Sequence, residues 1–265
     1  MILLADVGNT TTVLAVGARH DSLPATDRPA RPSPAGIAIL ERRRVPTPPA
    51  GEGGKVTAAA RELATAHPGL PAVIVSVVPA VTDRLREAWP AAHVVGEAGP
   101  FPFALGVSAP AAVGADRYAN VAAAAAAGWT SALVVDCGTA VTFDVLRDGV
   151  FAGGLIAPGL ELAARALGER AARLRPVPPA PCPLAPAPDT DTALRAGGFH
   201  VGAAGVVATA RALAADLGDA PVVVTGGWGG MLRSPHLRPP APAGWRWDPE
   251  WSLRGAAVLG LLAGA

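Results

Sequence analysis

Two short segments of the chain share a pattern: an aspartate, any residue, a glycine and then a threonine within two positions. One begins at Asp6 and the other at Asp136. Glycine lets the backbone approach an anion and offers an N–H that no Cβ covers, and threonine adds a hydroxyl donor. An aspartate repels phosphate unless a cation lies between them. Each segment therefore indicates a phosphate site that includes a metal ion.

An ordinary hairpin turn has the same composition, because Asp, Asn and Gly are common turn residues. For the first segment alone, both interpretations stay open. The second copy favours the functional one, although chance recurrence of so short a pattern is possible. The two aspartates are 130 positions apart, about half of the chain. A repeat on this scale predicts two related domains that face each other, and we place them at residues 1–117 and 118–265.

A third segment, residues 114–117, combines Asp116 and Arg117 just before a stretch rich in alanine. The stretch predicts a helix, whose N-terminus favours anions through its free N–H groups and its dipole. There Asp116 could accept a proton and Arg117 could hold a carboxylate. The alternative is that Asp116 caps the helix and Arg117 is a surface charge. The segment alone leaves both open.

Apolar runs and turn residues predict the elements that position these segments. Strands are expected at 1–5, 11–16, 37–45, 72–78, 93–95, 134–135, 141–145 and 221–225, and helices at 56–66, 82–89, 116–128, 160–174, 189–217 and 251–263. Residues 100–110 read as a loop. Alternating strands and helices predict an α/β layer architecture. The strand at 221–225 ends in two glycines, where such folds bind ligands.

The amino-acid composition limits the kinds of binding partner and compartment that the chain suggests. The 265 residues include 22 basic and 21 acidic ones, so the net charge of +1 suggests neither nucleic acid nor an anionic membrane surface. Lys55 is the only lysine, so arginine, backbone N–H groups or metal must supply cationic contacts to phosphate. Two cysteines without metal-ligand spacing favour a reducing cytoplasm. No run reaches the roughly 18–20 apolar residues of a membrane span.

Six segments in this order and spacing resemble the type III pantothenate kinase family. That family belongs to the superfamily of acetate kinase, sugar kinases, heat-shock chaperones and actin. The resemblance covers nearly the whole chain and implies an α/β fold of two related ribonuclease H-like domains across a nucleotide cleft, the actin-like ATPase fold. The matching segments are residues 6–10, 76–79, 114–117, 136–140, 153–159 and 225–227.

The resemblance also implies a function: ATP-dependent phosphorylation of pantothenate to 4'-phosphopantothenate, which starts coenzyme A synthesis. It implies a homodimer with substrate sites close to the dimer interface. Asp116 would be the general base, and Asp136 would bind a monovalent cation, potassium or ammonium, while Mg²⁺ accompanies ATP. Pantothenate would contact Gly114, Ala115, Asp116, Arg117 and Thr190, and ATP would contact Asp6, Val7, Gly8, Asn9, Thr10, Thr11, Thr12, Val13 and Thr139.

The chain departs from the family at one position and leaves another open. The family usually has a tyrosine three residues before the proline that matches Pro110, but this chain has Val107 there, and its only tyrosine is Tyr118. The family also has a threonine that contacts the substrate at the start of the long helix in the second half of the chain. Spacing favours Thr190 for this position, with Thr192 as the alternative. Two other functions stay compatible: a non-catalytic regulator on the same fold, like the Bvg accessory factor, or a kinase of another small hydroxyl compound.

Overall fold

The computed structural model describes the chain except for residues 25, 27–32, 50–53, 97, 98 and 265. Its internal contacts define two compact units. Unit 1 comprises residues 1–130, 146–153 and 250–265, and unit 2 comprises residues 131–145 and 154–249. The predicted division at 117/118 was drawn from the repeated motif rather than from contacts, and it stays a prediction about how the two halves are related.

Unit 1 contains a five-stranded sheet in the order β3-β2-β1-β4-β5. Strand β1 is central: it pairs antiparallel with β2, from Ile2↔Gly17 to Val7↔Thr12, and parallel with β4. This arrangement confirms the predicted hairpin around the first aspartate. The strands are β1 (Ile2–Val7), β2 (Thr11–Arg19), β3 (Ile37–Pro46), β4 (Ala72–Ser76) and β5 (His93–Val94).

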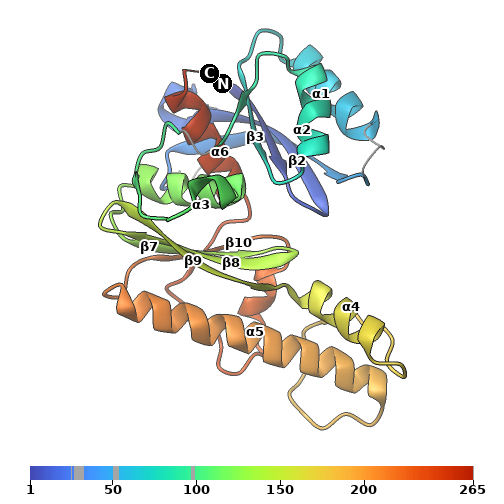
Figure 1. Cartoon of the computed structure of the whole chain (residues 1–265). Helices are drawn as coiled ribbons and strands as arrows, with labels where there is room; N and C mark the ends of the chain where they lie inside the picture. Colours follow the sequence, from blue (N-terminus) through green and yellow to red (C-terminus); the bar gives the residue numbers. More distant parts are fainter. Residues whose placement is uncertain (25, 27–32, 50–53, 97–98, 265) are drawn as a thin grey trace. The chain divides into compact units, whose positions relative to one another are not determined.

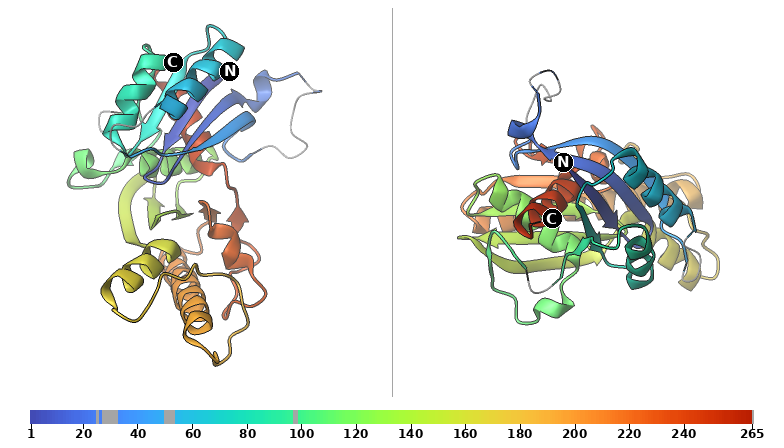
Figure 2. Two further views of the ribbon diagram at one scale, coloured as in Figure 1. Left: turned by 90° about the vertical axis from the view of Figure 1, so that its right-hand side faces the viewer. Right: turned by 90° about the horizontal axis from the view of Figure 1, so that it is seen from above.

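Helices cover both faces of this sheet (Figures 1 and 2). Leu3 and Val7 on β1 pack into one core with α1 (Gly54–Ala66) and α2 (Pro79–Ala88). Their neighbours point to the opposite face, because side chains alternate along a strand. That face is covered by α6 (Trp251–Leu262), which contacts β1 and β4. Burial on both sides explains why β1 reads as a continuous apolar run.

Helix α3 (Ala115–Ala126) packs on α6 within unit 1. The indole Nε1 of Trp251 donates to the Asn120 carbonyl over 3.0 Å, and the Ser252 hydroxyl donates to Asn120 Oδ1 over 2.8 Å. The Trp251 ring also stacks on Trp129, with 5.7 Å between ring centroids. The last helix of the chain therefore fixes the helix that carries Asp116.

Unit 2 is built on a second sheet, in which β11, β10, β7, β8 and β9 are neighbours in that order. The parallel pairing of β10 with β7 aligns Thr225 with Asp136. At the far edge, β6 (Ala104–Leu105) pairs with the first residues of β9, and these paired residues belong to unit 1. The strands are β7 (Ala132–Cys137), β8 (Ala140–Arg147), β9 (Val150–Pro158), β10 (Val222–Thr225) and β11 (Arg246–Trp247).

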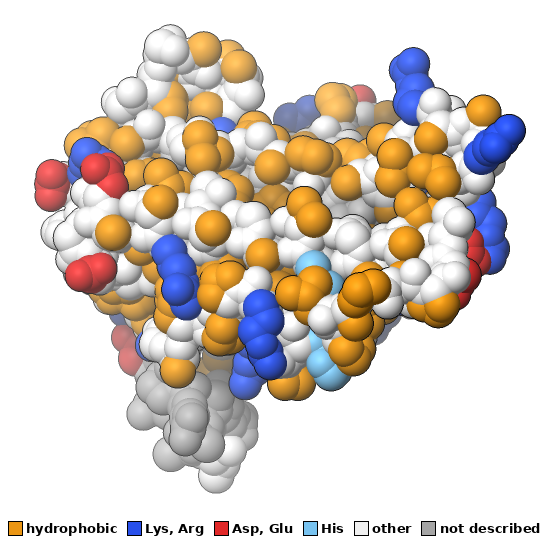
Figure 3. Space-filling view, turned by 90° about the horizontal axis from the view of Figure 1, so that it is seen from below, with side chains coloured by type: hydrophobic (Ala, Val, Ile, Leu, Met, Phe, Trp, Pro, Cys, Tyr) orange, Lys and Arg blue, Asp and Glu red, His pale blue; other side chains and the backbone are white. Residues whose placement is uncertain are grey.

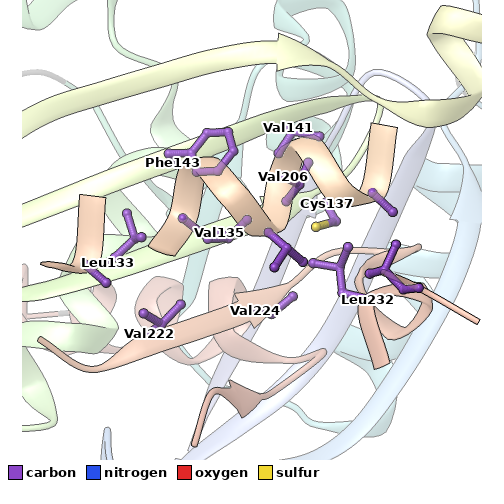
Figure 4. Packing of buried hydrophobic residues seen from close by; sticks show 14 of the residues in the cluster. Leu133, Val135, Cys137, Val141, Phe143, Val206, Val222, Val224 and Leu232 are labelled. Carbon is purple, nitrogen blue, oxygen red and sulfur yellow. The ribbon is translucent and has the colours of Figure 1, made fainter. Parts of the chain in front are cut away.

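The core of unit 2 lies between this sheet and the long helix α5 (Thr190–Asp216), as Figure 4 shows. Inward side chains of β7 and β8 pack against small and branched residues of α5. The helix also places its two ends far from each other, since 27 residues at about 1.5 Å per residue span roughly 40 Å. The packed residues include Leu133, Val135, Cys137, Val141, Phe143, Phe199, Ala203, Val206, Val207 and Ala210.

By length and composition α5 is also apolar enough to cross a membrane, although no apolar run in the sequence predicted a span there. A single helix of this kind is weak evidence, because the core helix of a globular domain meets the same criterion. Only 39% of its most apolar window is buried.

Several predicted bounds need correction. Helix α2 begins at Pro79, three residues early, because proline suits the first turn of a helix. Helix α4 (Leu160–Arg170) ends four residues early. The predicted loop at 100–110 contains β6, and a 3-10 helix, η3 (Pro110–Ala112), begins at its last residue. Trp247 packs against the core of unit 2, whereas Trp251 belongs to unit 1.

The contact between α3 and α6 depends on Gly255. A methyl group at this position would overlap the backbone carbonyl of Ala119. We expect Gly255→Ala to force the helices apart and to lower the free energy of unfolding by about 1–3 kcal/mol, the range for overpacking. Denaturant unfolding measures this.

Gly205→Ala is the matched control, since Gly205 is an exposed helix residue with open space around its Cβ position. It should leave stability unchanged or raise it by up to about 1 kcal/mol. Equal stability losses in both variants would contradict the packing argument.

Candidate functional site

The first Asp-x-Gly turn joins β1 to β2 at the carboxyl end of β1. The Gly8 N–H donates to the Thr11 carbonyl over 3.0 Å, which closes the turn. Asn9 and Thr10 are exposed at its tip, and Asp6 is half-buried. The exposed amide, hydroxyl and backbone groups make the tip a suitable surface for an anion.

Not every residue predicted to contact ATP is accessible in this turn. The Val7 side chain belongs to the core, and Thr12 is fully buried. The Thr12 hydroxyl lies 3.0 Å from the hydroxyl of Thr47. Thr47 in turn donates to the Gly8 carbonyl over 2.6 Å. Thr47 directly follows β3, and the sequence analysis missed it because no motif includes it.

The second turn joins β7 to β8 in unit 2 and closes in a similar way, with the Gly138 N–H donating to the Ala140 carbonyl over 3.0 Å. Asp136 and Thr139 are half-buried, whereas Cys137 points into the core. Burial raises the pKa of the Cys137 thiol, and the charge of Asp136 raises it further. Cys137 is therefore a packing residue and not a nucleophile.

Two glycines pack closely on this second turn. Gly226 has a positive φ of 85°, and a Cβ there would lie 2.5 Å from Asp136 Oδ1 and from the Cys137 backbone. A Cβ at Gly159 would overlap the carbonyls of Gly138 and Thr139. Gly226 and Gly159, which belong to two of the matched segments, thus allow the backbone of those segments to pack directly on the second turn.

Trp228, two residues after Gly226, was not predicted to have a role. Its indole Nε1 donates to the Gly138 carbonyl over 2.9 Å, and its backbone N–H donates to the Cys137 carbonyl over 3.2 Å. An aromatic residue after a glycine turn was the only sequence signal that could have indicated it.

Asp116 lies in the first turn of α3, where Gly114 is the N-cap. The alternative that Asp116 is itself the capping residue is therefore wrong, but its Oδ1 does accept the Arg117 N–H over 2.9 Å. Burial raises the pKa of the Asp116 carboxyl, and the Arg117 contacts offset only part of this rise. A carboxylate with a raised pKa beside a partly exposed surface has the properties of a general base.

Val77 connects this helix start to the first turn within unit 1. Its backbone N–H donates to the Val7 carbonyl over 3.0 Å. Its side chain lies against Gly114, since a Cβ at Gly114 would be 3.3 Å from Val77 Cγ1. Residues 76–79 therefore hold the end of β1 next to the start of α3. Asp6, Asp116 and Arg117 all belong to this unit, while Asp136 and Thr139 belong to unit 2.

The ring of Phe151 lies against Arg117. Its guanidinium carbon lies 5.5 Å from the centroid of the Phe151 ring, a cation–π distance. Phe151 packs edge-on against Tyr118. Tyr118 is fully buried, and its hydroxyl donates to the Pro110 carbonyl over 2.9 Å. Tyr118 therefore stabilises its own core and does not replace the tyrosine that the family has at the position of Val107.

At the start of α5 the two candidate substrate threonines, Thr190 and Thr192, have different environments. Asp189 caps the helix and accepts from both the N–H and the hydroxyl of Thr192, each over 2.8 Å. These hydrogen bonds lower the pKa of Asp189. Thr190 is exposed. The helix cap thus accounts for Thr192, and Thr190 stays the predicted substrate residue.

The donors near the first turn fit a metal carried by a nucleotide. Among the described residues no group of three or more His, Cys, Asp or Glu side chains forms a metal cage. Mg²⁺ in kinases is usually held by one or two carboxylates together with substrate phosphates. Asp6, at the end of a strand and next to a glycine turn, suits that mode, while Asp136 stays the residue predicted to bind the monovalent cation.

Solved structures with similar folds define the class. A conserved putative Baf family transcriptional activator from Campylobacter jejuni aligns with 99% of this chain and 100% of its own, with a TM-score of 0.56 and 16% identity. The ROK hexokinase from Thermus thermophilus aligns with 100% of this chain and 99% of its own, with a TM-score of 0.50 and 17% identity. The chain has the actin-like ATPase fold of sugar kinases.

Sequence comparison gives the family. The profile of type III pantothenate kinase matches residues 2–212. Proteins named type III pantothenate kinase from Streptomyces avermitilis and Streptomyces coelicolor are 34% and 33% identical over 254 residues, covering 88% of this chain and 89% of theirs. The chain belongs to the type III pantothenate kinase family, as the sequence motifs indicated.

Gly114 controls where the Asp116 carboxylate lies. A Cβ at Gly114 would be 2.5 Å from Asp116 Oδ1, and the backbone φ of −61° is compatible with alanine. In Gly114→Ala the carboxylate must therefore rotate while the fold is retained. We expect turnover to fall by about tenfold or more, because Asp116 is the predicted general base and small misplacements of such a group are costly. Steady-state kinetics together with thermal unfolding separate the two effects.

Gly96→Ala is the control in the same unit, since open space surrounds that Cβ position. Turnover of Gly114→Ala at the wild-type rate would show that the position of the carboxylate is not restricted by Gly114.

Proposed function

We propose that this protein transfers the γ-phosphoryl group of ATP to the primary hydroxyl of pantothenate. Family membership supports this reaction and implies ATP with a divalent metal. The single observation in the structure that carries it is Asp116, a carboxylate with a raised pKa in the first turn of α3, adjacent through Val77 to the glycine turn after β1.

Asp116 is the proposed general base. One carboxylate oxygen accepts the Arg117 N–H, and we assign the other to the proton of the substrate hydroxyl. The hydroxyl oxygen then attacks the γ-phosphorus, the bond to the β-phosphate oxygen breaks, and ADP leaves with the electron pair. Phosphoryl transfer depends mainly on positioning and on neutralising charge. The base only has to remove a proton as the new bond forms.

Gly114, Ala115, Arg117 and Thr190 are the proposed substrate contacts. Pantothenate carries a carboxylate, which the Arg117 guanidinium can bind through two parallel hydrogen bonds. Phe151 holds the guanidinium from one side and limits its freedom before substrate binds. Val107 supplies no hydroxyl where the family has tyrosine, so Arg117 carries more of the recognition here.

The two turns are the proposed phosphate contacts, with Asp6, Gly8, Asn9, Thr10 and Thr11 in unit 1 and Thr139 in unit 2. Val13 is half-buried beside the first turn, and Thr12 acts through Thr47 rather than directly. Asp136 is the proposed ligand of the monovalent cation. When bound, the metal ions neutralise phosphate charge. The chain's single lysine, Lys55, lies on α1 and belongs to none of the matched segments.

A homodimer is the proposed assembly. Large hydrophobic side chains are exposed on three elements of unit 2: Ile156 on β9 is 65% exposed, and Val201 on α5 is 77% exposed. Leu162 and Leu167 on α4 are exposed as well. Figure 3 shows hydrophobic side chains spread over one face of the molecule, with few acidic ones among them. Such exposed apolar surface supports association with a second copy. We also propose a cytoplasmic location. Both cysteines are free thiols, which agrees with a reducing compartment.

The reaction is tested by a coupled assay of ADP release with ATP, Mg²⁺ and pantothenate, run in potassium, ammonium and sodium salts. We expect turnover that requires pantothenate and is several-fold faster with potassium or ammonium. Other small hydroxyl compounds in place of pantothenate form the control panel. ADP release only with another compound would assign a different substrate, and none with any compound would favour a non-catalytic regulator.

Asp116→Asn tests the base. The amide oxygen can still accept the Arg117 N–H, so the fold should persist, while turnover should fall by about 10²–10⁴-fold. In the wild type, kcat/KM should decline as pH falls through the raised pKa of Asp116, at a higher pH than for an ordinary aspartate.

The pH dependence of stability should be opposite to that of kcat/KM: the contribution of Asp116 to the free energy of unfolding should increase as pH falls. Since the folded-state pKa is raised, protonated Asp116 favours folding, and this contribution is lost as pH rises through that pKa. At neutral pH we therefore expect Asp116→Asn to unfold no more easily than the wild type, with the difference shrinking in acid. Denaturation at several pH values measures this. If Asp116→Asn keeps the wild-type turnover, Asp116 is not the general base.

A further inference from the structure

In both units a side chain from a distant segment holds the carbonyl of the turn glycine. In unit 1 the donor is the Thr47 hydroxyl, 2.6 Å from the Gly8 oxygen. In unit 2 the donor is the Trp228 indole, 2.9 Å from the Gly138 oxygen. The donors differ in residue type and in the strand that they follow, yet each binds the equivalent carbonyl.

In unit 1 the direction of these hydrogen bonds can be assigned. A hydroxyl has one proton, and Thr47 gives it to the Gly8 carbonyl. The 3.0 Å contact between the two threonine hydroxyls therefore has Thr12 as donor. The Thr47 backbone N–H also donates to the Thr10 carbonyl over 3.0 Å. Thr47 thus holds two carbonyls of one turn, and Thr12 holds Thr47.

In unit 2 Trp228 has the same effect with different groups. Its indole and its backbone N–H donate to the consecutive carbonyls of Gly138 and Cys137. The Gly159 N–H donates to the next carbonyl, that of Thr139, over 2.9 Å. The indole is half-buried and packs against the core of unit 2, so its position is fixed.

The direction of a carbonyl matters for an anion site because the peptide unit is planar and trans. When the C=O of one residue is held in one direction, the N–H of the next residue points the opposite way. A held Gly8 carbonyl therefore orients the Asn9 N–H, and a held Gly138 carbonyl orients the Thr139 N–H. Without such a hold, a glycine peptide can rotate and present its partly negative oxygen to a phosphate.

We propose that Thr47 and Trp228 are positioning residues for the phosphates of ATP: each orients the glycine peptide of the turn in its own unit so that an N–H group, and not a carbonyl oxygen, is presented to phosphate. This inference rests on the proposed ATP-dependent function. It extends that function to residues outside every motif that the sequence shares with the family.

The test uses the full-length chain with Thr47→Val, Thr47→Ser and Trp228→Phe. Valine removes the hydroxyl at nearly constant shape, serine keeps it, and phenylalanine keeps a ring without the N–H. We expect the KM for ATP and the Kd of the Mg²⁺ complex of the non-hydrolysable analogue AMP-PNP to rise about five- to tenfold in the valine and phenylalanine variants, the effect of one hydrogen bond. The KM for pantothenate should be unchanged, and Thr47→Ser should resemble the wild type.

Thr82→Val and Trp89→Phe are matched controls. They remove the same donor types from other backbone carbonyls, since the Thr82 hydroxyl donates to Val78 and the Trp89 indole donates to Ala60. These variants should lose stability without losing nucleotide affinity. If they weaken AMP-PNP binding as much as Thr47→Val does, the role is only structural and the inference is wrong.

Other outcomes separate this inference from the proposed function. Unchanged AMP-PNP affinity in Thr47→Val and Trp228→Phe, or failure of serine to restore it, overturns the inference even if pantothenate is phosphorylated. AMP-PNP binding by the wild type without pantothenate turnover overturns the proposed substrate and leaves the comparison of variants valid. A wild-type protein that binds no AMP-PNP contradicts both. If Thr47→Val fails to fold, Trp228→Phe still decides the result.

Discussion

The position of α3 depends on a backbone contact, in which Gly255 of α6 lies directly against the carbonyl of Ala119. No side chain could fill this space, so the two helices approach as closely as their backbones allow. Asn120 then makes polar contacts with Trp251 and Ser252 that fix the relative position of the helices. A carboxylate whose chemistry depends on a small displacement needs such a rigid support. The C-terminal helix, although remote in sequence from Asp116, is therefore part of what positions it.

This support holds Asp116 in an environment that disfavours its charge. Burial raises the pKa of the carboxyl, and the charge would be more stable in water. A stability penalty at a site is common where the chemistry needs a group ready to accept a proton. The packing of α3 on α6 offsets the penalty. Ala119 and Asn120, which make these contacts, lie within about one helical turn of Asp116, so the stabilising contacts and the proposed base are neighbours on α3.

The sequence predicted the parts of this arrangement that are local. Asp6, Gly8, Asp116 and Asp136 each belong to a contiguous motif, and the strands beside them are read from continuous apolar runs. The helices α5 and α6 were also predicted within a few residues, because their sequences are apolar over a long continuous stretch. Bounds set by tertiary contacts were less accurate: β6 is two residues long and exists only through its pairing with β9.

Residues that act across the sequence could not be predicted in this way. Thr47 and Gly8 are 39 positions apart, and Trp228 and Gly138 are 90 apart. A lone threonine in a proline-rich segment has many possible roles, and the relevant one exists only after β3 has paired with β2. Val77 differs in part: it lies in the matched segment 76–79, but its contacts with the end of β1 and the start of α3 are known only from the fold. Single-sequence patterns carry no information on such pairings.

The composition of the chain gives a physical reason for the role proposed for Thr47 and Trp228. A phosphate site without lysine relies on arginine, metal ions and backbone N–H groups, and backbone N–H groups carry only partial charges. Such groups attract an anion only when several point toward it and the neighbouring carbonyls point away. A rotated glycine peptide would replace a favourable partial charge by an unfavourable one at the same place. The glycine that permits close approach of a phosphate also permits this rotation. A conformationally free turn therefore needs an external donor, and Thr47 and Trp228 each provide one.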